Sequence, residues 1–147
     1  RNFILDDSLR RNVAFGVNED SINDFRVIQV LEIVGLKGLL DGLSEGLDTI
    51  LGEHGSRLSG GQIQRVCIAR SLYKDPEILI YDEATSDLDE TSQAEVVKCL
   101  SQLGPLKTII RVTHSLSTIK YADRVFMVED GTAREVTNLH QTTVNKL

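Results

Sequence analysis

Two adjacent carboxylates that follow a short apolar run are the first candidates for chemistry in this sequence. Asp82 and Glu83 come directly after residues 78–81, whose run Ile-Leu-Ile-Tyr predicts a strand buried on both faces. Because a carboxylate is costly to bury, the pair should lie at the exposed end of this strand or face a cation. Neighbouring residues of a strand point to opposite sides. One carboxylate can therefore hold Mg²⁺ while the other activates a water for attack on a phosphoryl group. The alternative is a strand that merely ends in polar residues.

A glycine-rich start marks the helix that apolar spacing predicts over residues 60–73. Ser59 and Gln62 are sufficient for a capping box, which is a purely structural explanation of this start. A cap does not require Gly60 and Gly61, however, and glycine is a poor helix former. The two glycines indicate a ligand that approaches the backbone closely. Free N–H groups at a helix N-terminus favour an anion such as phosphate.

The third candidate is His114, which follows a β-branched run over residues 108–113 that predicts a second strand. A lone histidine is more often structural than catalytic. Its place at the carboxyl end of a strand, one crossover from Asp82 and Glu83, favours a functional role instead. A histidine there can donate a hydrogen bond to a phosphate oxygen and contact the attacking water.

The elements that position these residues alternate between helices and strands. Helices are predicted over 60–73, 90–103 and near 116–121, and strands over 78–81, 108–113 and 125–129, with a turn at Asp130–Gly131. This alternation is typical of an α/β fold with a parallel sheet and crossover helices. Ligands of such sheets bind beyond the carboxyl ends of the strands, where the three candidates lie.

The first third of the chain predicts a small helical subdomain. One helix is expected over residues 8–16. A second should begin at Ser21, with Asp24 completing a capping box, and end at Gly35. The following stretch is rich in glycine, with a short helix near Leu39.

Composition places the chain among ordinary globular domains. It has 147 residues, of which 41% are hydrophobic and 26% charged, enough for one domain with a core. The net charge of −6 argues against nonspecific binding of nucleic acid. Since the chain begins with Arg1 inside what reads as continuous structure, we expect it to be a piece of a longer protein.

Taken together, these motifs resemble the nucleotide-binding domain of ATP-binding cassette (ABC) transporters. Leu-Ser-Gly-Gly-Gln at 58–62 resembles the signature sequence, and Ile-Leu-Ile-Tyr-Asp-Glu at 78–83 resembles the Walker B strand. Ser-Asp-Leu-Asp at 86–89 resembles the loop that crosses the dimer interface, and Thr-His-Ser-Leu-Ser-Thr at 113–118 the histidine switch. Residues 3–16 are similar to the segment after the glutamine loop of exporters. Four motifs in the family's order make a chance match very improbable.

The resemblance implies a partial P-loop NTPase-type parallel sheet with an N-terminal helical subdomain. It also implies two such domains in a head-to-tail dimer, with ATP and Mg²⁺ between them. A transmembrane domain would be the second partner, at the cytoplasmic face of a membrane. The domains we expect are a helical subdomain over 1–57, the C-terminal part of the ATPase core over 58–131, and a divergent tail over 132–147 without an assigned role.

The resemblance also implies roles for single residues. Within one subunit, Asp82 would act on Mg²⁺, Glu83 as general base, and His114 on the γ-phosphate. Two aspartates of the interface loop, Asp87 and Asp89, would couple the two sites. The residues implied to contact the ATP of the partner subunit are Ser59, Gly60, Gly61 and Gln62.

The sequence departs from the family in what it lacks. The Gly-x-x-x-x-Gly-Lys-Ser/Thr phosphate loop is absent, as is the aromatic residue that stacks on adenine. Both would lie upstream of Arg1, so truncation explains them, and we expect the chain alone to bind ATP poorly or not at all. Two alternatives stay open: a soluble ABC ATPase of DNA repair or the ribosome, and a non-catalytic fragment that only binds a partner.

Overall fold

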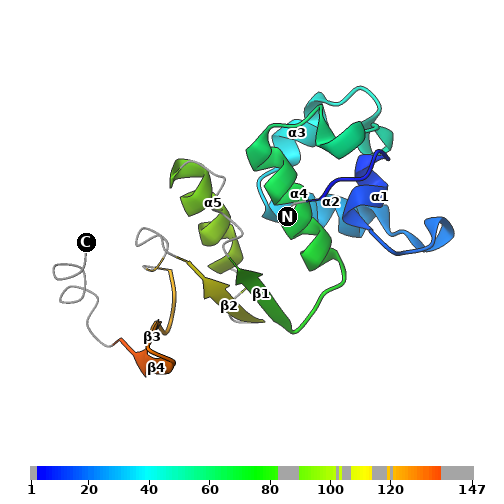
Figure 1. Cartoon of the computed structure of the whole chain (residues 1–147). Helices are drawn as coiled ribbons and strands as arrows, with labels where there is room; N and C mark the ends of the chain where they lie inside the picture. The colour runs from blue at the N-terminus through cyan, green and yellow to red at the C-terminus, as the bar shows by residue number, and fades with distance from the viewer. Residues whose placement is uncertain are drawn as a thin grey trace.

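The computed structural model describes residues 3–82, 90–101, 103, 107–113, 119 and 121–136 (Figure 1). Short 3₁₀ helices lie at Glu19–Ser21, Gly46–Asp48 and Glu53–Gly55. The longer elements are α1 (Leu9–Val13), α2 (Asp24–Ile33), α3 (Lys37–Gly42), α4 (Gly60–Tyr73), β1 (Ile78–Asp82), α5 (Glu90–Ser101), β2 (Thr108–Val112), β3 (Phe126–Glu129) and β4 (Thr132–Glu135). In the part of the chain described, no helix combines the length and the apolar character needed to cross a bilayer.

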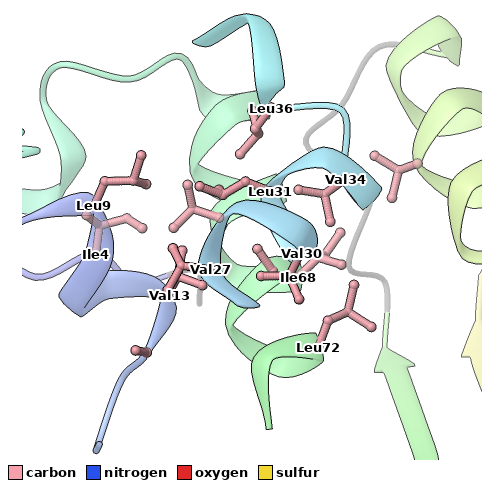
Figure 2. Packing of buried hydrophobic residues seen from close by; sticks show 14 of the residues in the cluster. Ile4, Leu9, Val13, Val27, Val30, Leu31, Val34, Leu36, Ile68 and Leu72 are labelled. Carbon is pink, nitrogen blue, oxygen red and sulfur yellow. The ribbon is translucent and has the colours of Figure 1, made fainter. Parts of the chain in front are cut away.

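Helix α4 is the centre of the helical part and packs against α1 and α2. Its buried face carries apolar side chains at helical spacing, and α1 and α2 turn similar faces toward it (Figure 2). Their shared core is built from Leu9, Val13, Val27, Val30, Leu31, Val66, Ile68 and Leu72. The predicted helices near Leu39 and over 60–73 are present, the latter with the predicted bounds, whereas the helix expected over 8–16 is shorter and ends at Val13.

The start of α2 differs from the prediction. We expected Ser21 to cap this helix, but Ser21 ends a 3₁₀ turn and the helix begins at Asp24. Asn23 is the cap, since its Oδ1 accepts the N–H of Arg26 at 3.1 Å. Asparagine caps a helix as well as serine does, and Asn23 stands closer than Ser21 to the apolar face of the helix, so Asn23 is the cap. The end is as predicted, because α2 stops at Ile33 and Gly35 takes a φ of 72°.

Strands β1 and β2 form the predicted parallel pair, which confirms the α/β class. They run in register from Ile78 opposite Thr108 to Asp82 opposite Val112. Helix α5 lies in the connection between them, as a parallel crossover requires, and buries Val96 and Leu100 (Figure 1).

The expected burial of residues 78–81 on both faces is wrong in this structure. Leu79 and Tyr81 are buried, but Ile80 is 69% exposed and Ile78 is exposed beside it. Their neighbours on β2, Ile110 and Val112, are exposed too, so one face of the pair is open and apolar. An apolar run shows that both faces suit a core. It does not show what covers them, and no element in the described residues covers this one.

The third predicted strand exists but does not extend the parallel sheet. β3 pairs antiparallel with β4, and the two join through Asp130 and Gly131, whose φ angles are both positive. That geometry fits a two-residue hairpin turn. β4 begins at Thr132, so the segment that we left without a role starts with a strand. The predicted helix near 116–121 lies almost wholly outside the described residues.

Candidate functional site

The tip of α4 is a complete capping box. The Oγ of Ser59 accepts the N–H of Gln62 at 3.2 Å, and the Oε1 of Gln62 accepts the N–H of Ser59 at 2.9 Å. The structural explanation of this motif, a capping box, is therefore correct. It accounts for both side chains of the box but not for the glycines between them.

Gly60 and Gly61 present their N–H groups at this tip. The first turn of a helix has N–H groups without intrahelical partners, and the box satisfies only those of Ser59 and Gln62. A Cβ placed on Gly60 would meet no atom within 4 Å, so no packing within the described residues explains the glycine. The backbone is open to an approaching group, as a phosphate site at a helix N-terminus requires.

The loop before the tip is held by the N-terminal segment. Leu51 donates to the carbonyl of Asp7 at 3.0 Å, and Leu9 donates to that of Thr49 at 2.9 Å. Gly55 takes a φ of 72° and has no room for a side chain, since an added Cβ would lie 3.2 Å from Ile4 and from Ile63. The path of the chain into α4 is thus fixed by packing.

Asp82 ends β1 at its carboxyl end, as predicted, and is exposed. Side chains alternate along the strand, so Asp82 shares the open face with Ile78 and Ile80. The adjacent Tyr81 points the other way, where burial raises the pKa of its hydroxyl and keeps it protonated. α4 and β1 run in opposite directions around the turn that joins them (Figure 1). The side-chain hydrogen bonds described at the tip join Ser59 and Gln62 to each other and do not involve Asp82.

The remaining predicted site residues lie outside the described residues. These are Glu83, Asp87, Asp89 and His114, so their predicted roles stay predictions. Among the residues that are described, no three acidic, histidine or cysteine side chains cluster as a complete metal site would require. Asp82 alone offers Mg²⁺ an exposed carboxylate at the sheet end, which suits an ion that binds through one or two carboxylates and water.

Some polar groups of α4 were not singled out from the sequence. Gln64 is 1% exposed, and neither of its amide atoms has a hydrogen-bond partner in the described structure. Arg70 is half-buried and contacts the N-terminal segment through Asn12, which is fully buried. The signal available was a polar residue inside an apolar helical pattern. Such a signal identifies the residue but not its partner.

Comparisons with known proteins agree with this geometry. The sequence matches the profile of the family described as ABC transporter over residues 5–86, more than half of the chain. It is 45% identical over 129 residues to the ATP-dependent lipid A-core flippase of Ralstonia nicotianae, covering 87% of this chain. It is 40% identical over 144 residues to the leukotoxin translocation ATP-binding protein LktB of Mannheimia glucosida, covering 98% of this chain.

A solved structure shares the fold. The chain resembles a bacterial Atm1-family ABC exporter with ATP bound, with a TM-score of 0.75 and 33% identity over 88% of this chain. It spans between 20% and 22% of the length of each of these three relatives. The profile match, the shared fold and the order of the motifs together show that this chain belongs to the ABC transporter family.

Proposed function

We propose that this chain is part of the ATP-hydrolysing domain of an ABC exporter, at the cytoplasmic face of a membrane. The observation that carries the proposal is the tip of α4, where the cap is complete and the backbone at Gly60 is open to an approaching group. Such a tip favours an anion. The relatives described above are named for ATP-dependent flipping, translocation and export, which supports ATP as that anion and favours an exporter over a soluble ATPase.

The proposed site is shared between two ATPase domains. Ser59, Gly60, Gly61 and Gln62 would hold the phosphates of an ATP that is bound mainly by a second, head-to-tail domain. In the chain's own site, Asp82 would act on Mg²⁺, Glu83 would take the proton of the attacking water, and His114 would contact the γ-phosphate. Asp87 and Asp89 would lie between the two sites.

A neighbouring transmembrane domain completes the proposed assembly. We also propose that residues 1–57 form a helical subdomain of the ATPase domain and that residues 58–131 form the C-terminal part of its core. Without a phosphate loop, this chain alone supplies too few donors to hold a triphosphate, so activity belongs to the full-length protein.

The test is Glu83→Gln in the full-length protein that carries this chain. The amide keeps the shape of the side chain but cannot accept a proton, so we expect hydrolysis to fall by at least about a hundredfold. ATP binding, measured by equilibrium dialysis, should be retained. Glu77→Gln is the matched control, because Glu77 is exposed near the opposite end of β1 and has no proposed role. Unchanged hydrolysis in Glu83→Gln would refute the role given to this residue.

A further inference from the structure

Arg70 joins α4 to the N-terminal segment through several contacts at once. Its Nε donates to the carbonyl of Asn12 at 2.8 Å, and its Nη2 donates to the Oδ1 of the same residue at 3.2 Å. Its Nη1 donates to the carbonyl of Phe3 at 2.9 Å. The guanidinium also lies over the ring of Phe15, 5.1 Å from its centre. One side chain of α4 thus holds both ends of the segment 3–15.

Asn12 makes the segment itself rigid. Its side chain is buried, donates to the carbonyls of Leu5, Asp7 and Ser8, and accepts the N–H of Leu5 at 2.8 Å. A buried amide with all of these partners holds the backbone in one arrangement. The segment that Arg70 binds is therefore a folded unit, and a displacement of it can be passed on to α4.

The same segment also holds the loop that leads into α4, near the tip. Residues 7–9 pair with residues 49–51, and the chain then turns through Gly55 into the capping box. Ile4 packs where a side chain on Gly55 would otherwise lie. Arg70 is ten residues beyond Gly60, which places Arg70 about 15 Å along the helix from the tip. The segment is thus in contact both with α4 at Arg70 and with the loop that precedes the tip.

Burying an arginine costs free energy, and an arginine without a structural role would stay exposed to solvent. Desolvation lowers the pKa of Arg70, so the fold opposes its charge here and gains hydrogen bonds in return. A lysine could not replace it, because one ammonium group cannot reach three acceptors in a fixed fork and stack on a ring.

We infer that Arg70 is a positioning residue. It holds the segment 3–15 against α4 and thereby orients the glycine tip of α4 toward the phosphate that the tip contacts. This inference rests on the proposed function of the tip. It concerns how the tip is oriented, and it adds no group to the chemistry. A displacement of the segment 3–15 should move the tip of α4. If the contacts of Arg70 to this segment are lost, the tip should stay folded but take a different orientation.

The experiment compares Arg70→Lys with Arg124→Lys in the full-length protein. Arg124 is a matched control, because it also stacks on a ring, that of Phe126 at 4.9 Å, and pairs with a carboxylate, that of Glu135. We expect Arg70→Lys to lower kcat by about tenfold or more, since small misplacements of catalytic groups have effects of this size. The KM for ATP should change by less than about twofold, since the lost contact matters only in the assembled site. Arg124→Lys should change neither.

Hydrogen exchange of the same proteins separates positioning from folding. In Arg70→Lys the amides of Leu5 and Leu9 should exchange faster, while the interior of α4 stays protected. If kcat is unchanged, or falls only as folded protein is lost, the inference is overturned. Should Arg70→Lys fail to fold, Phe15→Leu removes the ring and leaves the hydrogen bonds. A loss of kcat in that variant supports the inference, and an unchanged kcat overturns it.

The variant Ser59→Asp at the tip distinguishes a failure of this inference from a failure of the proposed function. If Ser59→Asp abolishes hydrolysis while Arg70→Lys is normal, the inference fails and the proposed function stands. If Ser59→Asp hydrolyses ATP normally, the tip does not contact phosphate, and both fail.

Discussion

Replacing Ser59 with aspartate separates the two roles of the α4 tip, because it preserves the cap and opposes an anion. Aspartate is as good a cap as serine, and its carboxylate can accept the N–H of Gln62 that the Oγ of Ser59 now accepts at 3.2 Å. A negative charge at the N-terminus of a helix is also favourable. We therefore expect the free energy of unfolding to change by less than about 0.5 kcal/mol.

The effect on a bound phosphate should be much larger. A phosphate oxygen on the N–H of Gly60 would lie about 4 Å from the new carboxylate, where two like charges repel by about 4 kcal/mol at a typical surface dielectric. Because the tip is exposed, solvent screens part of this repulsion. A loss of about 2 kcal/mol, or about thirtyfold in kcat/KM, is the smallest effect we expect.

The assay is ATP hydrolysis by the full-length protein, with thermal melting of the same samples. Asn23→Asp is the matched control, because Asn23 caps α2 with the same geometry, is exposed, and lies at a helix without glycines at its start. It should retain hydrolysis. Normal hydrolysis in Ser59→Asp would refute the phosphate contact. A loss of hydrolysis matched by an equal loss of stability would show that Ser59 is only a cap.

Three further predictions concern the 147-residue chain and are checked by urea unfolding. Leu31→Ala should lower the free energy of unfolding by about 3 kcal/mol, because Leu31 is fully buried on α2, which packs against α4; a loss below about 1 kcal/mol would contradict the packing. Gly55→Ala should cost about 2 kcal/mol for its positive φ and crowded site, whereas Gly38→Ala, in open space within α3, should be neutral or stabilising. The hydrogen bond from Lys107 lowers the pKa of Asp75, so its contribution is present above about pH 4 and lost as pH falls through the lowered folded pKa. The difference in urea midpoint between wild type and Asp75→Asn should then be constant from about pH 5 to 7 and shrink below pH 4, and a difference that persists at pH 2 would contradict it.

Local signals were sufficient for α4 and insufficient for α2. In α4 the box of Ser59 and Gln62 stands at the start of the apolar pattern, and the predicted bounds are correct. Before α2, both Ser21 and Asn23 can cap. Which one does so depends on how the helix meets its neighbours, as the bond from Asn23 N–H to the hydroxyl of Tyr73 at 2.9 Å shows. Propensity alone does not contain that contact.

Apart from the parallel pairing of β1 with β2, contacts between distant residues could not be predicted. Periodicity identified residues 125–129 as a strand, but the partner of a strand is a tertiary choice, and β3 pairs with β4 instead of β2. The Arg70 contacts to Asn12 join residues 58 positions apart. The sequence shows that both are polar residues in apolar helices. Only the fold shows that each satisfies the other, which is why the tip could be predicted and its support could not.

Helix α4 links the two halves of the proposed site because it is held along its whole length. Its tip follows the pairing of residues 7–9 with 49–51, and Arg70 grips the same N-terminal segment further along. At the far end Asp75 accepts from both Arg26 of α2 and Lys107 beside β2. Exposed ion pairs of this kind add little stability, but a carboxylate shared between two elements restricts their relative positions. Since the turn after Asp75 leads directly into β1, these contacts hold α4 between the loop before its glycine tip and the strand that ends at Asp82.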